Sequence, residues 1–135
     1  MDKIEFLILK NLLNNEDYMR KVVPFVKADY FEDSNQKVVF EEIFSFVSQY
    51  NEVPTREIIS IEVEKRKDLN ETTLKEVSHL IGCLDETPVE YEWLLNTTEK
   101  WCRDRAIYLA LMDAIHIADG NDEKRGRDAI PSILS

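Results

Sequence analysis

Apolar residues recur every three or four positions along most of this chain, which is the spacing of one face of an α-helix. The first predicted helix covers residues 2–14 and is apolar around much of its circumference. A short helix follows Asn15 and is expected to break near Pro24, because proline donates no amide hydrogen and its ring clashes with the preceding turn. Three further helices are predicted, each after a capping side chain: about 34–50 after Asp33, 56–66 after Thr55 and 71–84 after Asn70.

A long helix is predicted to begin at Thr87-Pro88-Val89-Glu90. This segment has the pattern of a capping box, in which the Thr87 oxygen accepts from the Glu90 amide and the Glu90 carboxylate reaches back. No residue then interrupts the helical pattern before Gly120, so about 32 residues would span about 48 Å. Such a helix is longer than a compact globule of this size is wide. The pattern therefore predicts an all-α fold, with a small helical head and a long protruding helix that begins a helical hairpin.

The second half of this long helix is its most apolar part. Between Ala106 and Ala118, only Asp113 and His116 are polar. A helix that is apolar over more than half of its circumference needs cover on two sides. One interpretation is a central helix of a single bundle, and the preferred one is a hairpin whose outer face packs on a second copy of the chain. The predicted self-association surface consists of Trp101, Arg105, Tyr108, Leu109, Met112 and Ile115.

The domain organisation follows from these elements. Residues 1–86 are expected to form the head, and residues 87–135 the long helix, a polar loop over 120–128 and the start of the second hairpin helix. Because the apolar pattern that restarts at 129–134 stops at once, we expect the chain to be a fragment of a longer protein. The core of the head is expected to contain Phe6, Leu9, Leu13, Phe31, Phe40, Ile43, Phe44, Val47 and Leu74.

Charge and composition reduce the number of functions that fit this sequence. The 135 residues include 17 Lys and Arg against 27 Asp and Glu, a net charge of −10. Domains that bind nucleic acid are usually basic, whereas this chain is acidic. We therefore expect its binding of single-stranded DNA to be weak and salt-dependent. The cluster Lys65-Arg66-Lys67 is interpreted as a solvated turn. A helix-turn-helix reader is disfavoured because its best candidate helix, 56–66, carries as many acids as bases. Two isolated cysteines and short apolar runs predict a soluble intracellular chain with no membrane association.

Candidate chemistry is sparse. Two pairs, Glu76/His79 and Asp113/His116, have the spacing that di-iron helical bundles use, but those sites need every ligand to face inward. Glu76 and His79 are predicted on the solvent side of their helix, which disfavours a metal centre. The three glycines form no phosphate-binding loop or nucleophile elbow. We therefore predict no catalytic, cofactor-binding or metal-binding residue and no enzymatic activity for this chain; a metal-dependent enzyme ranks third among the alternatives.

The order of these segments resembles the N-terminal domain of DnaB-type replicative helicases, and most closely those of T-even-type phages. The resemblance covers nearly the whole chain, and its motifs are mostly core patterns whose order is the distinctive feature. It is carried by residues 4–13, Asp29-Tyr30-Phe31, residues 39–44, Val53-Pro54-Thr55, Tyr91, Arg105-Ala106, Glu123-Lys124-Arg125 and Ala129-Ile130-Pro131.

The resemblance implies a non-catalytic domain that assembles the helicase. In that family, helical hairpins pair the subunits into a collar on a hexameric ring, which moves on single-stranded DNA and engages primase and helicase loaders. ATP and Mg act in a separate ATPase domain that is not part of this sequence, so no cofactor is expected here. The resemblance implies contact with DNA only through the full ring and a host-cell cytoplasmic location. Because the second hairpin helix is expected to be truncated, we expect a dimer or a monomer–dimer equilibrium for this piece, and not a hexamer. The alternative is a free-standing phage adaptor or regulator that docks on another protein.

Overall fold

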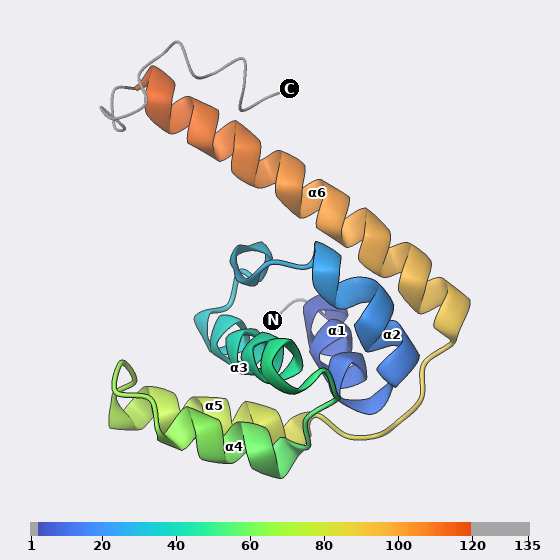
Figure 1. Ribbon diagram of the computed structural model, residues 1–135. Helices are drawn as coiled ribbons and strands as arrows, with labels where there is room; N and C mark the ends of the chain where they lie inside the picture. Colours follow the sequence, from blue (N-terminus) through green and yellow to red (C-terminus); the bar gives the residue numbers. More distant parts are fainter. Residues whose placement is uncertain (1–2, 120–135) are drawn as a thin grey trace. The chain divides into compact units, whose positions relative to one another are not determined.

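The computed structural model describes residues 3–119, and this part of the chain is built from helices without a β-strand (Figure 1). The predicted all-α fold is confirmed. The chain divides into two compact units, Met1–Thr98 and Glu99–Ser135, whose boundary lies within the last helix. The α-helices are α1 (Lys3–Asn14), α2 (Glu16–Val22), α3 (Ser34–Tyr50), α4 (Arg56–Glu64), α5 (Glu71–Cys83) and α6 (Tyr91–Ala118), with short 3-10 helices at Val23–Phe25 and Ala28–Tyr30.

Local capping explains where most of these helices begin. In four of the predicted caps, a side-chain oxygen accepts a hydrogen bond from an amide of the first turn, a contact that stabilises a helix by about 1 kcal/mol. The end of α3 is fixed differently. Asn51 adopts the left-handed conformation with φ 55°, and the Arg20 guanidinium donates to its side-chain oxygen at 2.9 Å and to its carbonyl at 3.0 Å. The four confirmed caps are Asn15, Asp33, Thr55 and Asn70.

The core of the first unit lies around α3. This helix packs on α1, α4 and α5, while α2 packs on α1 and α4 packs on α5 (Figure 1). The Phe31 ring, just before α3, lies 5.3 Å from the Phe40 ring between centroids. The predicted core positions Leu9, Leu13, Phe31, Phe40 and Ile43 are buried.

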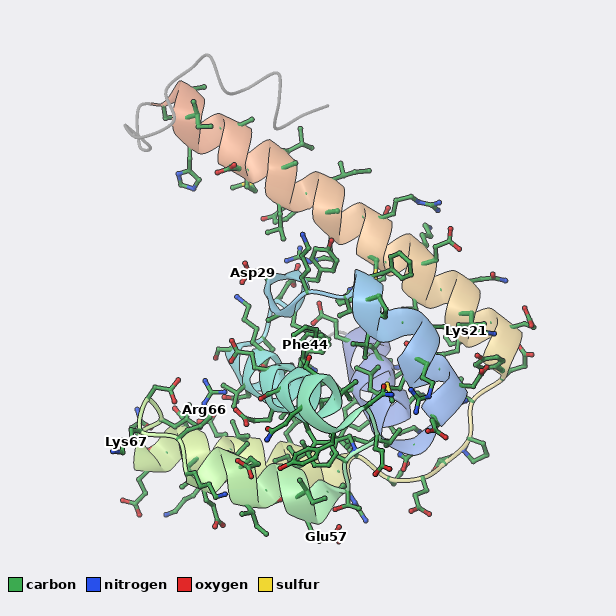
Figure 2. The ribbon with its side chains drawn as sticks, viewed as in Figure 1. Lys21, Asp29, Phe44, Glu57, Arg66 and Lys67 are labelled. Carbon is green, nitrogen blue, oxygen red and sulfur yellow. The ribbon has the colours of Figure 1, made fainter. Side chains whose placement is uncertain are left out.

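The predicted burial of Phe44 is wrong. Its side chain is 44% exposed and its ring stacks over Phe40 at 6.1 Å between centroids (Figure 2). Phe44 follows Phe40 by one turn on the same side of α3, and the apolar face there is wider than the area that the other helices cover. Phe6, Val47 and Leu74 are also only partly buried.

The predicted capping box before α6 is also wrong. The helix begins at Tyr91, because the Glu90 carboxylate accepts from the amides of Glu92 at 3.2 Å and Trp93 at 2.6 Å. The Thr87 amide donates instead to the Asp85 side chain at 3.1 Å. The helix therefore has 28 residues rather than about 32. The predicted polar loop 120–128 and the second hairpin helix lie outside the described residues.

Candidate interaction surface

The first turns of α6 belong to the first unit and contact α2. The Tyr91 hydroxyl donates to the Asp17 carboxylate, and the Lys21 ammonium lies 3.4 Å from the same oxygen and 5.4 Å from the Tyr91 ring centre. The hydrogen bond from Tyr91 is the main reason that the pKa of Asp17 is lowered, and the same bond raises the pKa of Tyr91. These groups are exposed to solvent, so they orient the helix more than they stabilise it.

A buried contact fixes α6 one turn further along. Leu94 is completely buried, and the Tyr18 hydroxyl shares a 2.7 Å hydrogen bond with the Thr98 hydroxyl. Tyr18 is 0% exposed and Thr98 is 2% exposed. A buried hydroxyl that loses its partner costs about 1–3 kcal/mol. The root of α6 is therefore held on α2 by an apolar side chain and a satisfied polar pair.

The second half of α6 carries an exposed apolar row. Ile107, Leu111 and Ile115 are 56%, 48% and 50% exposed, and the neighbouring Tyr108 is 49% exposed. Residues four apart are neighbours on a helix surface, so the three aliphatic side chains form a ridge along one side of α6. We call Ile107, Tyr108, Leu111 and Ile115 the α6 stripe. Contiguous exposed apolar surface of this kind marks sites of protein interaction.

Two of the six predicted self-association residues belong to this stripe. Tyr108 and Ile115 belong to it, and the Arg105 guanidinium stacks on the Tyr108 ring at 4.9 Å. Leu109 and Met112 are partly buried, and Trp101 is only 7% exposed. Their role in self-association stays a prediction.

Sequence reasoning left Ile107 and Leu111 out of the predicted surface. Both lie in the apolar arc of the helical wheel, together with Ile115. The four-residue spacing of Ile107, Leu111 and Ile115 was the signal in the sequence that could have placed them on one exposed surface.

The structure also places the candidate metal and thiol groups. Glu76 and His79 are exposed on α5, as predicted, and Glu76 accepts a 2.8 Å hydrogen bond from the Asn35 amide group. Within residues 3–119, no three His, Cys, Asp or Glu side chains gather into a group that could hold a metal ion. Cys83 is exposed, whereas burial raises the pKa of Cys102 to about 11. The Cys102 thiol therefore stays protonated at neutral pH and is a poor nucleophile.

The basic cluster between α4 and α5 is largely neutralised. Arg66 pairs with Glu41 at 3.2 Å, Glu42 at 3.1 Å and Asp68 at 2.7 Å, and the bond to Asp68 is the main reason that its pKa is raised. Lys65 pairs with Glu62 at 3.2 Å. These bonds tie α3 to the α4–α5 turn (Figure 2) and leave little positive charge there for phosphate groups.

No helix in the described residues is long and apolar enough to cross a membrane.

Comparison with known proteins finds a similar protein for this chain. No protein-family model matches the chain. The chain is 32% identical, over 95% of its length, to a DnaB-like replicative helicase of Enterobacteria phage T4, and it spans 28% of the length of that relative. The resemblance inferred from the order of the helices is thus confirmed: the chain is similar to the N-terminal domain of a DnaB-like replicative helicase.

Proposed function

We propose that this chain is the non-catalytic N-terminal assembly and partner-docking domain of a hexameric, ATP-dependent replicative DNA helicase. The observation that carries the proposal is the exposed α6 stripe in a chain that is similar to a replicative helicase over 95% of its length. In this proposal the α6 helices pair subunits, paired subunits build a collar, and the collar engages primase and a helicase loader. The protein acts in the cytoplasm of the host cell.

The size of the stripe sets the expected strength of pairing. Burying the exposed half of one large apolar side chain is worth about 1 kcal/mol. Two copies of the four-residue stripe would therefore gain about 8 kcal/mol, against an association cost of roughly 4–15 kcal/mol. We therefore expect weak pairing of this chain by itself. Attachment to a ring would strengthen it, because the second contact then forms within one assembly.

The chemical step belongs to another part of the protein in this proposal. ATP and Mg would act in an ATPase domain that this sequence does not contain, and DNA would be contacted only through the complete ring. The net charge of −10 supports this division, since an acidic domain repels a polyanion.

Sedimentation equilibrium on three proteins tests the assembly role. The parent should show a monomer–dimer equilibrium at about 100 μM, a concentration that corresponds to weak association. The double variant Leu111→Asp with Ile115→Asp should be monomeric, because two carboxylates replace half of the residues of the stripe. Ala106→Asp adds the same kind of charge to an exposed position on the far side of α6 and should behave as the parent does. A parent that is strictly monomeric at this concentration would contradict the assembly role.

The alternative, a free-standing adaptor that docks on another protein, has a separate test. The reading frame that follows this sequence should encode a phosphate-binding loop of the form G-x-x-x-x-G-K-S/T if the chain is part of a helicase. A stop codon directly after Ser135 would favour the adaptor.

A further inference from the structure

The last turn of α5 brings a thiol and an imidazole together. Cys83 follows His79 by four residues, so the two side chains lie on the same face of the helix. The Cys83 Sγ and the His79 Nε2 lie 3.7 Å apart, and both side chains are exposed to solvent. Sulfur and imidazole nitrogen are the atoms with which proteins most often bind zinc. We call these two residues the α5 pair.

The distance between the two donor atoms matches that of two ligands on one metal ion. Zinc binds cysteine sulfur at about 2.3 Å and histidine nitrogen at about 2.0–2.1 Å, with tetrahedral angles. These bond lengths place a sulfur ligand and a nitrogen ligand about 3.6 Å apart. The α5 pair already has this spacing, so a zinc ion can bind both atoms without movement of the helix backbone.

The contact within the α5 pair leaves the metal only one proton to replace. It is a weak hydrogen bond in which either atom can donate, depending on the tautomer of His79. When zinc binds, the thiol proton passes to the solvent, Cys83 becomes a thiolate ligand and His79 binds as the neutral imidazole. One Zn²⁺ ion enters and one proton leaves.

The surroundings of the α5 pair accept a cation. Cys83 is the last residue of α5, and the dipole of a helix favours positive charge at its C-terminal end. Both side chains line a groove of about 930 Å³ between α1 and α5, which has room for water molecules on the metal. The charged side chains that line the same groove are two cations and two anions: Lys3, Lys75, Asp33 and Glu76. Their charges balance, so the donor atoms and not the charge of the groove select the ligand.

The donor atoms favour zinc over the common hard cations. Mg²⁺ and Ca²⁺ take oxygen ligands, whereas thiolate and imidazole suit Zn²⁺. Within residues 3–119, no third His, Cys, Asp or Glu completes a metal-binding group. Two of the four positions of a tetrahedral ion are therefore left for water. The prediction of no metal-binding residue considered His79 only together with Glu76, and a site with Cys83 departs from it.

We propose that His79 and Cys83 form a zinc-binding site at the C-terminal end of α5, with two water molecules as the remaining ligands. The site has half of the protein ligands of a structural zinc site, so we expect a dissociation constant of about 1–100 μM. Zinc joins two positions one turn apart and thereby holds the last turn of α5 in the helical form. The proposal is independent of the assembly role, because neither residue belongs to the α6 stripe.

The chain offers a matched control for each ligand. It has two cysteines and two histidines, and one of each lies on α5 and the other on α6. Cys83→Ser and His79→Ala remove the proposed ligands. Cys102→Ser and His116→Ala remove the same chemical groups from α6. Because His79 and Cys83 are exposed, we expect their variants to keep the helical content of the parent in circular dichroism.

Titration with Cd²⁺, which replaces Zn²⁺ at thiolate sites, reports directly on the sulfur ligand. A cadmium–thiolate bond gives an ultraviolet charge-transfer absorption, measured in buffer that keeps the thiols reduced. The parent and Cys102→Ser should show this absorption with one metal ion per chain, and Cys83→Ser should not. A surviving absorption in Cys83→Ser would assign the sulfur ligand to Cys102 and overturn the site.

Calorimetric titration with Zn²⁺ tests the nitrogen ligand. The dissociation constant should be about tenfold or more larger for His79→Ala than for the parent, and it should be unchanged for His116→Ala. Saturating Zn²⁺ should also raise the melting temperature of the parent and leave that of both α5 variants unchanged, since binding to the folded chain stabilises it. Equal zinc affinity of His79→Ala and the parent would overturn the chelate. One metal ion per two chains would show that two copies share the ion, and would overturn the single-chain site.

Discussion

Helix α1 and the stripe side of the second half of α6 are both apolar but have opposite environments. In α1, Ile8, Leu9 and Leu12 are 0% exposed, because α2 and α3 both pack against that helix. In α6, Ile107, Leu111 and Ile115 are about half exposed. Apolar periodicity therefore predicts a helix and its apolar face, whereas the number of neighbouring helices decides how much of that face is buried.

Two phenylalanines one turn apart on α3 show the same contrast, and replacing the buried one should give the largest loss of stability. Phe40 is 2% exposed and Phe44 is 44% exposed. Phe40→Ala should lower the free energy of unfolding by about 3–5 kcal/mol, as the loss of a buried aromatic side chain does. Phe44→Ala should lower it by only about 1 kcal/mol, since much of its ring is already in water. Urea denaturation followed by circular dichroism measures both, and equal losses would show that Phe44 is buried in solution.

A leucine pair tests the contrast between α1 and α6 directly. Leu12→Ala should cost about 2–5 kcal/mol of unfolding free energy, because it opens a cavity in a filled core. Leu111→Ala, at a 48% exposed position, should change the unfolding free energy of the monomer by no more than about 0.5 kcal/mol. Thermal and urea unfolding at low protein concentration keep association out of the measurement. A large loss at Leu111 would mean that the stripe is covered within one chain, as in the single-bundle interpretation.

The hydrogen bond between Tyr18 and Thr98 should have an intermediate effect. Tyr18→Phe removes one hydroxyl and leaves the buried Thr98 hydroxyl without that partner, which should cost about 1–2 kcal/mol. The double variant Tyr18→Phe with Thr98→Val removes both hydroxyls and should recover part of the loss. Additive losses in this double-mutant cycle would show that the two hydroxyls do not interact in solution.

The exposed contact between Tyr91 and Asp17 at the start of α6 should give the smallest effect on the melting temperature. This effect should depend on pH. The pKa of Asp17 is lowered in the folded state, so its stabilising contribution is present above about pH 4 and is lost as the pH falls through the folded pKa. The pKa of Tyr91 is raised, so its contribution is present below pH 10 and is lost as the pH rises through the folded value. Tyr91→Phe should therefore melt slightly lower than the parent at pH 7 and equally at pH 2. A melting difference that persists unchanged at pH 2 would rule out the Asp17 carboxylate as its cause.

The sequence was most informative where an interaction is local. Asn15, Asp33, Thr55 and Asn70 each cap a helix through an amide two or three residues away, so the side chain and its spacing were sufficient to predict the contact. The same rule failed before α6, where two caps compete. Asp85 takes the Thr87 amide and Glu90 takes the amides beyond it. A preference between neighbouring caps depends on how the preceding segment runs, which the spacing does not specify.

Which side chains are buried and which surfaces stay exposed depends on how distant segments of the chain pack together. Phe40 and Phe44 are both phenylalanines and lie on the same side of α3. Only the positions of the neighbouring helices make one buried and the other partly exposed. An apolar groove lies between α1 and α5, lined by Phe6 and Leu7 on one side and Leu80 and Cys83 on the other. Both helices pack on α3, so no single helix pattern could predict this groove. For α6, the helical spacing places Ile107 and Leu111 on the apolar side of the helix but does not show which part of that side stays exposed.

The Tyr18–Thr98 contact has a consequence for how the head forms during synthesis. The two residues are separated by 80 positions, so the ribosome adds Thr98 roughly 4–16 s after Tyr18 at about 5–20 residues per second. During that interval α3, α4 and α5 are synthesised in turn, but the Tyr18 hydroxyl has no Thr98 and the site of Leu94 is empty. Closing a loop of this length also costs about 4 kcal/mol of chain entropy, far more than a local cap does. The head therefore reaches its final form only when the root of α6 has emerged, and folding of the first unit is coupled to the arrival of the helix that carries the stripe.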